Sequence, residues 1–108
     1  MSFTIPAWFY PEESGYEPKT TFWMDFSIAD PFGPSAVRDT FNRAFTEWRE
    51  NGEYLTELAL VLNHKAWAWH GRDDALCQLY SDLYEQADGW ALDHLKGEML
   101  DYYLATID

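Results

Sequence analysis

The sequence predicts an all-α fold: an antiparallel three-helix bundle with an aromatic N-terminal arm and a short C-terminal helix. Between residues 34 and 95, apolar side chains recur every three or four positions in three successive segments, which is typical of helices packed on one side. Only Asn51-Gly52 and His70-Gly71-Arg72 separate these segments. Because connections this short place consecutive helices side by side, we expect antiparallel neighbours in a single domain of 108 residues.

The first predicted helix spans residues 34–51. Pro34 in its first turn loses no intrahelical hydrogen bond, and the neighbouring glycine and serine can cap free N–H groups. Asn51 and Gly52 tolerate the left-handed conformation that closes a helix, so we expect the helix to end there. Its expected core face carries Val37, Phe41, Ala44, Phe45 and Trp48.

The second and third predicted helices span residues 53–70 and 73–95. Gly71 should end the second, and Asp73 is a favourable N-cap for the third. The core face of the second helix is formed by Leu55, Leu58, Ala59, Leu62, Ala66 and Trp69. That of the third is formed by Leu76, Leu79, Tyr80, Leu83, Ala87, Trp90, Ala91 and His94.

Residues 1–32 form the arm, which is too rich in aromatic rings for a free tail. We expect it to wrap the bundle and to bury Trp8, Phe22 and Phe26 against the first and third helices. Rings of this size contribute strongly to a core when they are covered. The arm is therefore predicted to belong to the same domain as the bundle.

Within the arm, residues 21–30 favour a short helix. Thr21 can cap it, the apolar residues that follow have helical spacing, and Pro31 would stop it. The segment 20–23 is also rich in residues that favour strands, so a strand is the alternative. We favour the helix.

The C-terminal end is predicted as a short helix over residues 97–106. Apolar spacing continues beyond Leu95, but Gly97 costs a helix interior about 1 kcal/mol relative to alanine. Either the third helix kinks at Gly97 or a new helix starts there. We expect a break.

The net charge of −12, from nineteen acidic and seven basic side chains, argues against direct binding to nucleic acid or to an anionic membrane. A protein partner should instead offer a basic or apolar surface. The composition is also compatible with a homodimer. The single cysteine, Cys77, excludes an internal disulfide and fits a reducing compartment. No segment is apolar enough for a membrane span or a secretion signal. We therefore expect a cytoplasmic protein.

Four groups of residues carry a resemblance to known proteins: 22–30, Phe41 to Phe45 with Trp48, Thr56 to Leu58 with Leu62-Asn63, and His94 to Glu98. They resemble a family of short proteins of unknown function that is associated with conjugative elements of gut anaerobes. The resemblance covers roughly residues 20 to 108. It implies a small accessory protein carried on mobile DNA, acting in transfer, regulation or defence evasion, and it implies no activity, cofactor or catalytic residue.

Metal binding has one weak candidate pair, His94 and Glu98, four residues apart. Gly97 falls inside the pair, and the chain has no His-Glu-x-x-His motif and no repeated Glu-x-x-His motif. Ordinary surface or half-buried histidines are the better interpretation of these side chains. We expect neither a metal nor another cofactor.

Catalytic motifs are absent from the sequence. Cys77 lies one turn into the third helix, but Asp73 and Asp74 precede it, and nearby negative charge disfavours a thiolate. The chain has no nucleophile elbow, phosphate-binding glycine loop or dinucleotide fingerprint. We therefore expect a protein that is not an enzyme.

Two features of the sequence are candidates for binding a partner. On the second helix, Leu60 and Trp67 lie away from the core stripe, with His64 between them. Either this helix is central and packed on both faces, or this side is an interface. On the third helix, an acidic stripe extends toward Asp88. The alternative interpretation of this stripe is a helix face that simply contacts solvent. The stripe consists of Asp74, Asp82 and Glu85.

The sequence thus favours a non-enzymatic accessory or protein-binding role. The first alternative is an acidic DNA mimic, because carboxylates spaced along a helix can occupy the basic cleft of a nucleic-acid-binding enzyme or regulator. That alternative predicts carboxylates crowded on one surface, whereas the acidic residues here are spread along the chain. A small metal-dependent enzyme is the less favoured alternative.

Overall fold

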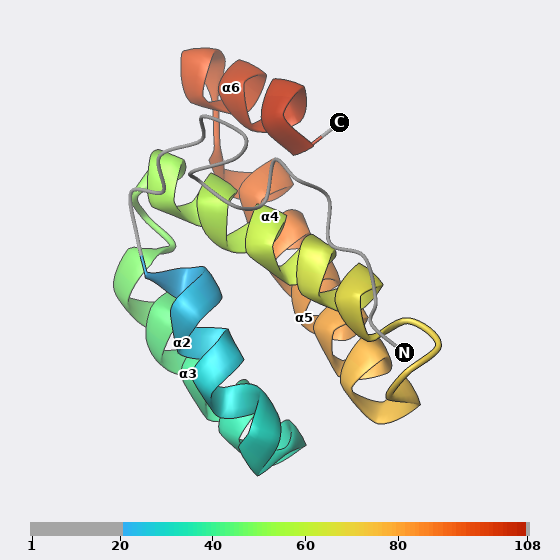
Figure 1. Ribbon diagram of the computed structural model, residues 1–108. Coiled ribbons are helices and arrows are strands. Elements are labelled where there is room, and N and C mark those ends of the chain that lie inside the picture. The colour runs from blue at the N-terminus through green and yellow to red at the C-terminus, as the bar shows by residue number, and fades with distance from the viewer. Residues whose placement is uncertain (1–20, 108) are drawn as a thin grey trace.

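The computed structural model describes residues 21–107 and confirms the all-α class (Figure 1). The elements within that range are α2 (Phe22–Ala29), the 3₁₀ turn η2 (Asp30–Phe32), α3 (Pro34–Trp48), α4 (Gly52–Trp69), α5 (Asp74–His94) and α6 (Gly97–Ile107). Figure 1 shows two antiparallel helix pairs, α2 with α3 and α4 with α5, and α6 lies across one end of the second pair. The three main helices and both short ones therefore form where the sequence predicts them.

Helix α4 is the central element of the described fold, because it packs on α2, α3, α5 and α6. Its buried side chains consequently occupy most of its circumference, and they include polar ones. They are Leu55, Thr56, Glu57, Leu58, Ala59, Val61, Leu62, Lys65 and Ala68. Apolar spacing alone is compatible with a central helix or with an exposed interface, and the structure shows that most of the surface of α4 is covered.

Helix α2 confirms the short helix that the arm was expected to contain. Phe22 and Phe26 are buried, and the Phe26 ring meets the edge of Tyr80 on α5 at a centroid distance of 5.6 Å. The helix also packs on α3, as expected. Thr21 makes no capping bond through its side chain. The prediction for Trp8, and for the rest of residues 1–20, lies outside the described residues.

The first connection differs from the prediction, because Asn51 and Gly52 begin a helix instead of ending one. Helix α3 ends at Trp48, and the Asn51 side chain accepts a hydrogen bond from the Tyr54 N–H at 3.1 Å, which caps α4. Asn51 is extended, with φ −97°. Gly52 fits here because a Cβ atom would lie 2.5 Å from Met99 Cε, so its lack of a side chain lets α6 approach.

The second connection and the C-terminal break are as predicted. Asp73 caps α5, accepting a hydrogen bond from the Leu76 N–H at 3.0 Å. Helix α5 ends at His94, and Gly97 adopts a left-handed φ of 60° where α6 begins. The Tyr103 side chain of α6 is fully buried and donates a hydrogen bond to Asp88 of α5. No helix within residues 21–107 is long and apolar enough to cross a membrane.

Candidate functional site

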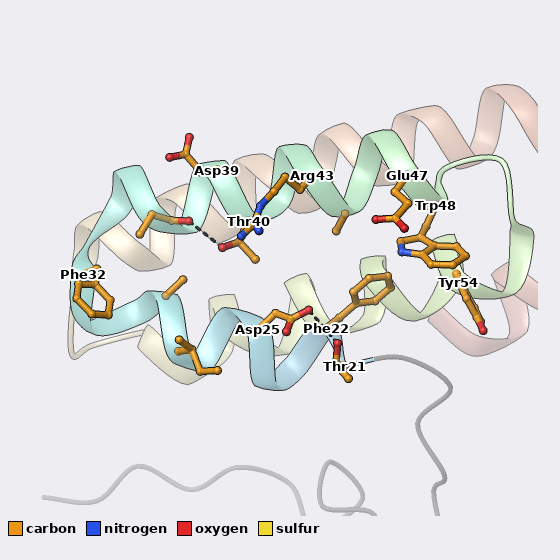
Figure 2. A pocket seen from close by; sticks show the side chains of 14 residues that line it. Thr21, Phe22, Asp25, Phe32, Asp39, Thr40, Arg43, Glu47, Trp48 and Tyr54 are labelled. Carbon is orange, nitrogen blue, oxygen red and sulfur yellow. Dashed lines mark hydrogen bonds between the residues drawn. The ribbon is translucent and has the colours of Figure 1, made fainter.

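An open groove of about 740 Å³ lies between α2 and α3. Figure 2 shows the two helices along its sides, with Phe32 at one end and Trp48 and Tyr54 at the other. Small side chains lie along much of its floor, so the backbones of the two helices are accessible to a close approach. These small residues are Ala29, Ala36, Thr40 and Ala44.

The α2 side of the groove exposes large apolar side chains. Met24, Ile28 and Phe32 follow one another at four-residue spacing along α2 and η2, and they are 63 %, 62 % and 77 % exposed. The opposite face of α2, with Phe22 and Phe26, is buried in the core. Helix α2 thus has two apolar faces, and within residues 21–107 only one of them is covered. Ile28 and Phe32 line the groove directly.

Charged side chains at the groove are predominantly acidic. Asp25 on α2 and Asp39 and Glu47 on α3 are exposed, and Arg43 is the basic lining residue. Asp25 accepts a hydrogen bond from the Thr21 hydroxyl at 3.0 Å. Within residues 21–107, no cation lies within ion-pair distance of the three carboxylates. The groove therefore combines apolar surface with a net negative charge.

A buried polar cluster holds the end of α2 in place against the other pair of helices. Lys65 on α4 donates from Nζ to Asp30 Oδ2 at 2.9 Å and to Ser27 Oγ at 2.8 Å. The Tyr80 hydroxyl of α5 donates to the other oxygen of the Asp30 carboxylate. Because Asp30 begins η2, two residues before Phe32, this cluster fixes the Phe32 end of the groove.

The Lys65 ammonium also lies 3.9 Å from the centre of the Trp23 ring, a cation–π contact. Burial lowers the pKa of Lys65, while the hydrogen bond and the charge of Asp30 oppose that shift. Burial and the Asp30 contact both raise the pKa of Tyr80. A second hollow, of about 540 Å³, borders Trp23 and Lys65. The ammonium is enclosed by three partners, an arrangement that fixes α2 on α4.

The predicted apolar stripe on α4 lies apart from the groove. Leu60 and His64 are half-buried, and Trp67 is 64 % exposed with its ring edge-on to His70 at a centroid distance of 5.9 Å. Burial lowers the pKa of His64 to about 4, so its ring is neutral at physiological pH. None of the three lines the groove between α2 and α3.

The acidic stripe on α5 is exposed over most of its length. Asp74, Asp82 and Glu85 face solvent, and Asp82 accepts a hydrogen bond from Gln78 at 2.9 Å. Asp88 differs from them, since it is half-buried and accepts the hydrogen bond from Tyr103. The exposed part of the stripe therefore ends before Asp88, whose carboxylate is occupied by Tyr103.

The histidines do not converge with carboxylates. His94 stacks on Trp90 at a centroid distance of 3.5 Å, and its Nδ1 lies 2.9 Å from the Trp90 carbonyl oxygen. Glu98 is exposed on α6, beyond the break at Gly97. In the part of the chain from 21 to 107, no three histidine, cysteine, aspartate or glutamate side chains are placed to hold a metal ion. Cys77 is a half-buried free thiol.

The groove is the feature that the sequence analysis missed. A signal for it was present, since Met24, Ile28 and Phe32 repeat at helical spacing opposite Phe22 and Phe26. A helix that is apolar on both faces is either central or leaves one face uncovered. Among residues 21–107, the second face of α4 is largely covered, with Trp67 left exposed, whereas the second face of α2 is exposed.

Comparison of the chain with known protein families, with curated proteins and with solved structures finds no match. The groove, its lining residues and the charges at its edge are therefore the features of the described chain that bear on function.

Proposed function

We propose that this protein is a non-enzymatic accessory protein that binds a segment of another protein in the groove between α2 and α3. The observation that carries the proposal is the uncovered row of Met24, Ile28 and Phe32 beside a groove of about 740 Å³. Clustered large apolar side chains on a small protein mark interaction sites, because their burial in a complex is favourable. The resemblance to proteins of conjugative elements, and the single cysteine, favour a cytoplasmic role on a mobile element.

The proposal is tested by affinity purification of the tagged protein from cells in which it naturally occurs. Ile28→Ser and Phe32→Ser are compared with Trp67→Ser, a control of matched exposure on α4. We expect a partner that is retained by the wild type and by Trp67→Ser and is lost with either groove variant. The partner is then purified and its direct binding is measured with the same variants. Retention that is unchanged in both groove variants would contradict the proposal.

The second candidate function is DNA mimicry, and the exposure of Asp74, Asp82 and Glu85 along α5 favours it. Steering by exposed charges weakens as salt rises, whereas apolar burial does not. The same purification at about 0.1 M and 0.5 M salt therefore separates the two functions. A basic nucleic-acid enzyme that is lost at high salt, and lost when the three carboxylates become amides, would favour mimicry over groove binding.

A further inference from the structure

We propose that the groove between α2 and α3 takes a basic amphipathic helix of a partner protein. This inference rests on the proposed function and names the chemistry of the bound segment.

The shape of the groove fits a helix. Helices α2 and α3 are antiparallel neighbours (Figure 1), and a third helix laid between them would complete a three-helix layer. The small residues Ala36, Thr40 and Ala44 recur every four positions along α3, and they let the ridge of a neighbouring helix approach to about 8–10 Å. No strand is present within residues 21–107, so the described fold offers no sheet edge for an extended peptide.

Apolar anchors of the occupant have defined places to bind. Ile28 and Phe32 lie one turn apart on one side of the groove, and Trp48 lies at the opposite end. The fifteen-residue helix α3 is about 22 Å long. A partner helix with apolar residues at i, i+4, i+7 and i+11 would span about 17 Å of this length and bury Ile28 and Phe32 together.

The charges at the groove select a basic partner. Asp25, Asp39 and Glu47 outnumber Arg43, and the three carboxylates have no ion-pair partner among residues 21–107. Lysine or arginine side chains that flank the apolar stripe of a bound helix would meet carboxylates on both sides, Asp25 from α2 and Glu47 from α3. Such complementarity increases the association rate and disfavours acidic competitors.

Segments of this chain itself do not fit the groove, because their charge has the same sign as the charge of the groove. A second copy carries a net charge of −12, and its C-terminal helix α6 exposes the acidic side chains Glu98 and Asp101. The N-terminal segment 1–20 contains three glutamates and one lysine. Both occupants would place like charges against an acidic groove, so we assign the groove to a different protein.

The test is a selection from a displayed library of 16-residue peptides with the full-length protein as bait. Because an acidic protein also retains basic peptides without specificity, the library is first depleted on the double variant Ile28→Ser/Phe32→Ser. We expect the enriched peptides to carry a positive net charge and apolar residues at helical spacing. Their affinity should fall at least about tenfold in Ile28→Ser and in Phe32→Ser, and should be unchanged in Trp67→Ser.

The contribution of charge is measured separately with Asp25→Asn/Glu47→Gln. We expect a loss of affinity of about three- to tenfold at low salt and a flatter dependence on salt. Circular dichroism checks that each variant remains folded, and these exposed positions should tolerate substitution. Enrichment of neutral or acidic peptides that still require Phe32 would contradict the proposal of a basic helix, but it would support the proposal that the groove binds a protein segment. An absence of any peptide that requires Ile28 or Phe32 would overturn both.

Discussion

Lys65 Nζ lies 2.9 Å from Asp30 Oδ2, and the two side chains are only 5 % and 6 % exposed. The pair joins α4 to the turn that follows α2, with Tyr80 of α5 as a third partner. A buried ion pair adds little net stability compared with a well-packed apolar pair, but removing one partner leaves a charge without compensation. The pair therefore specifies the position of α2, and hence of one side of the groove.

Asp30→Asn should destabilise the protein by about 3–5 kcal/mol, because the buried Lys65 ammonium loses its counter-charge. The double variant Asp30→Asn/Lys65→Met should be more stable than Asp30→Asn alone, since the unpaired charge is gone. Urea unfolding followed by tryptophan fluorescence measures both free energies. Equal stability of the single and double variants would show that the ammonium is not held in the way the structure shows.

His64 should make stability depend on pH between about 6.5 and 4. Burial lowers the pKa of His64 in the folded protein to about 4 from its ordinary 6.5, so the unfolded chain takes up the proton first as pH falls. The contribution is therefore fully present above pH 6.5 and is lost as pH falls toward 4. Because the ring is only half-buried and water screens its charge, we expect about 1–2 kcal/mol.

The measurement for His64 is the free energy of unfolding at intervals from pH 7 to 4 for the wild type and for His64→Gln. Subtracting the two curves removes the titration of the many carboxylates that both proteins share. The wild type should lose stability relative to His64→Gln as pH falls. Parallel curves would contradict a buried neutral histidine at this position.

The same substitution should have opposite effects at two glycines. Gly97 adopts a left-handed φ of 60°, so Gly97→Ala should cost about 1–2 kcal/mol. Gly89 lies within α5, and a Cβ atom there would meet nothing within 4 Å. Gly89→Ala should therefore stabilise the protein by up to about 1 kcal/mol. Thermal unfolding compares the two variants, and a melting temperature that shifts in the same direction for both would contradict the described break.

Tyr103→Phe should weaken the attachment of α6. The Tyr103 side chain is fully buried, and its hydroxyl donates a hydrogen bond to the half-buried Asp88 carboxylate. Removal of the hydroxyl leaves that carboxylate without this donor. We expect a loss of about 1–3 kcal/mol, whereas Tyr102→Phe, at an exposed position on the same helix, should have little effect. Hydrogen exchange of the α6 amides should accelerate in Tyr103→Phe alone, and equal protection in the two variants would contradict this role.

The sequence by itself determined the secondary structure of the described chain. The period of the apolar residues defined the helices, and Gly33-Pro34, Asp73 and Gly97 marked their ends, because these are effects of the local backbone. Asn51-Gly52 was misassigned as a stop, since a residue that can close one helix can also cap the next. What distinguishes the two roles is the extended conformation of Asn51 and its side-chain bond to the Tyr54 N–H, which residue type alone does not reveal.

Only the tertiary structure decided which apolar faces are covered. Two pairs of residues are alike in sequence, because each is apolar and lies opposite a core stripe. They are Leu60 and Trp67 on α4, and Ile28 on α2 with Phe32 on η2. Helix α4 is packed on four other helices, so its second face is largely covered, whereas α2 lies at the edge of the fold and its second face borders an open groove. The partner of Lys65 was hidden for the same reason: Asp30 is 35 residues away in sequence, and only the packing of α2 on α4 brings the two charges together.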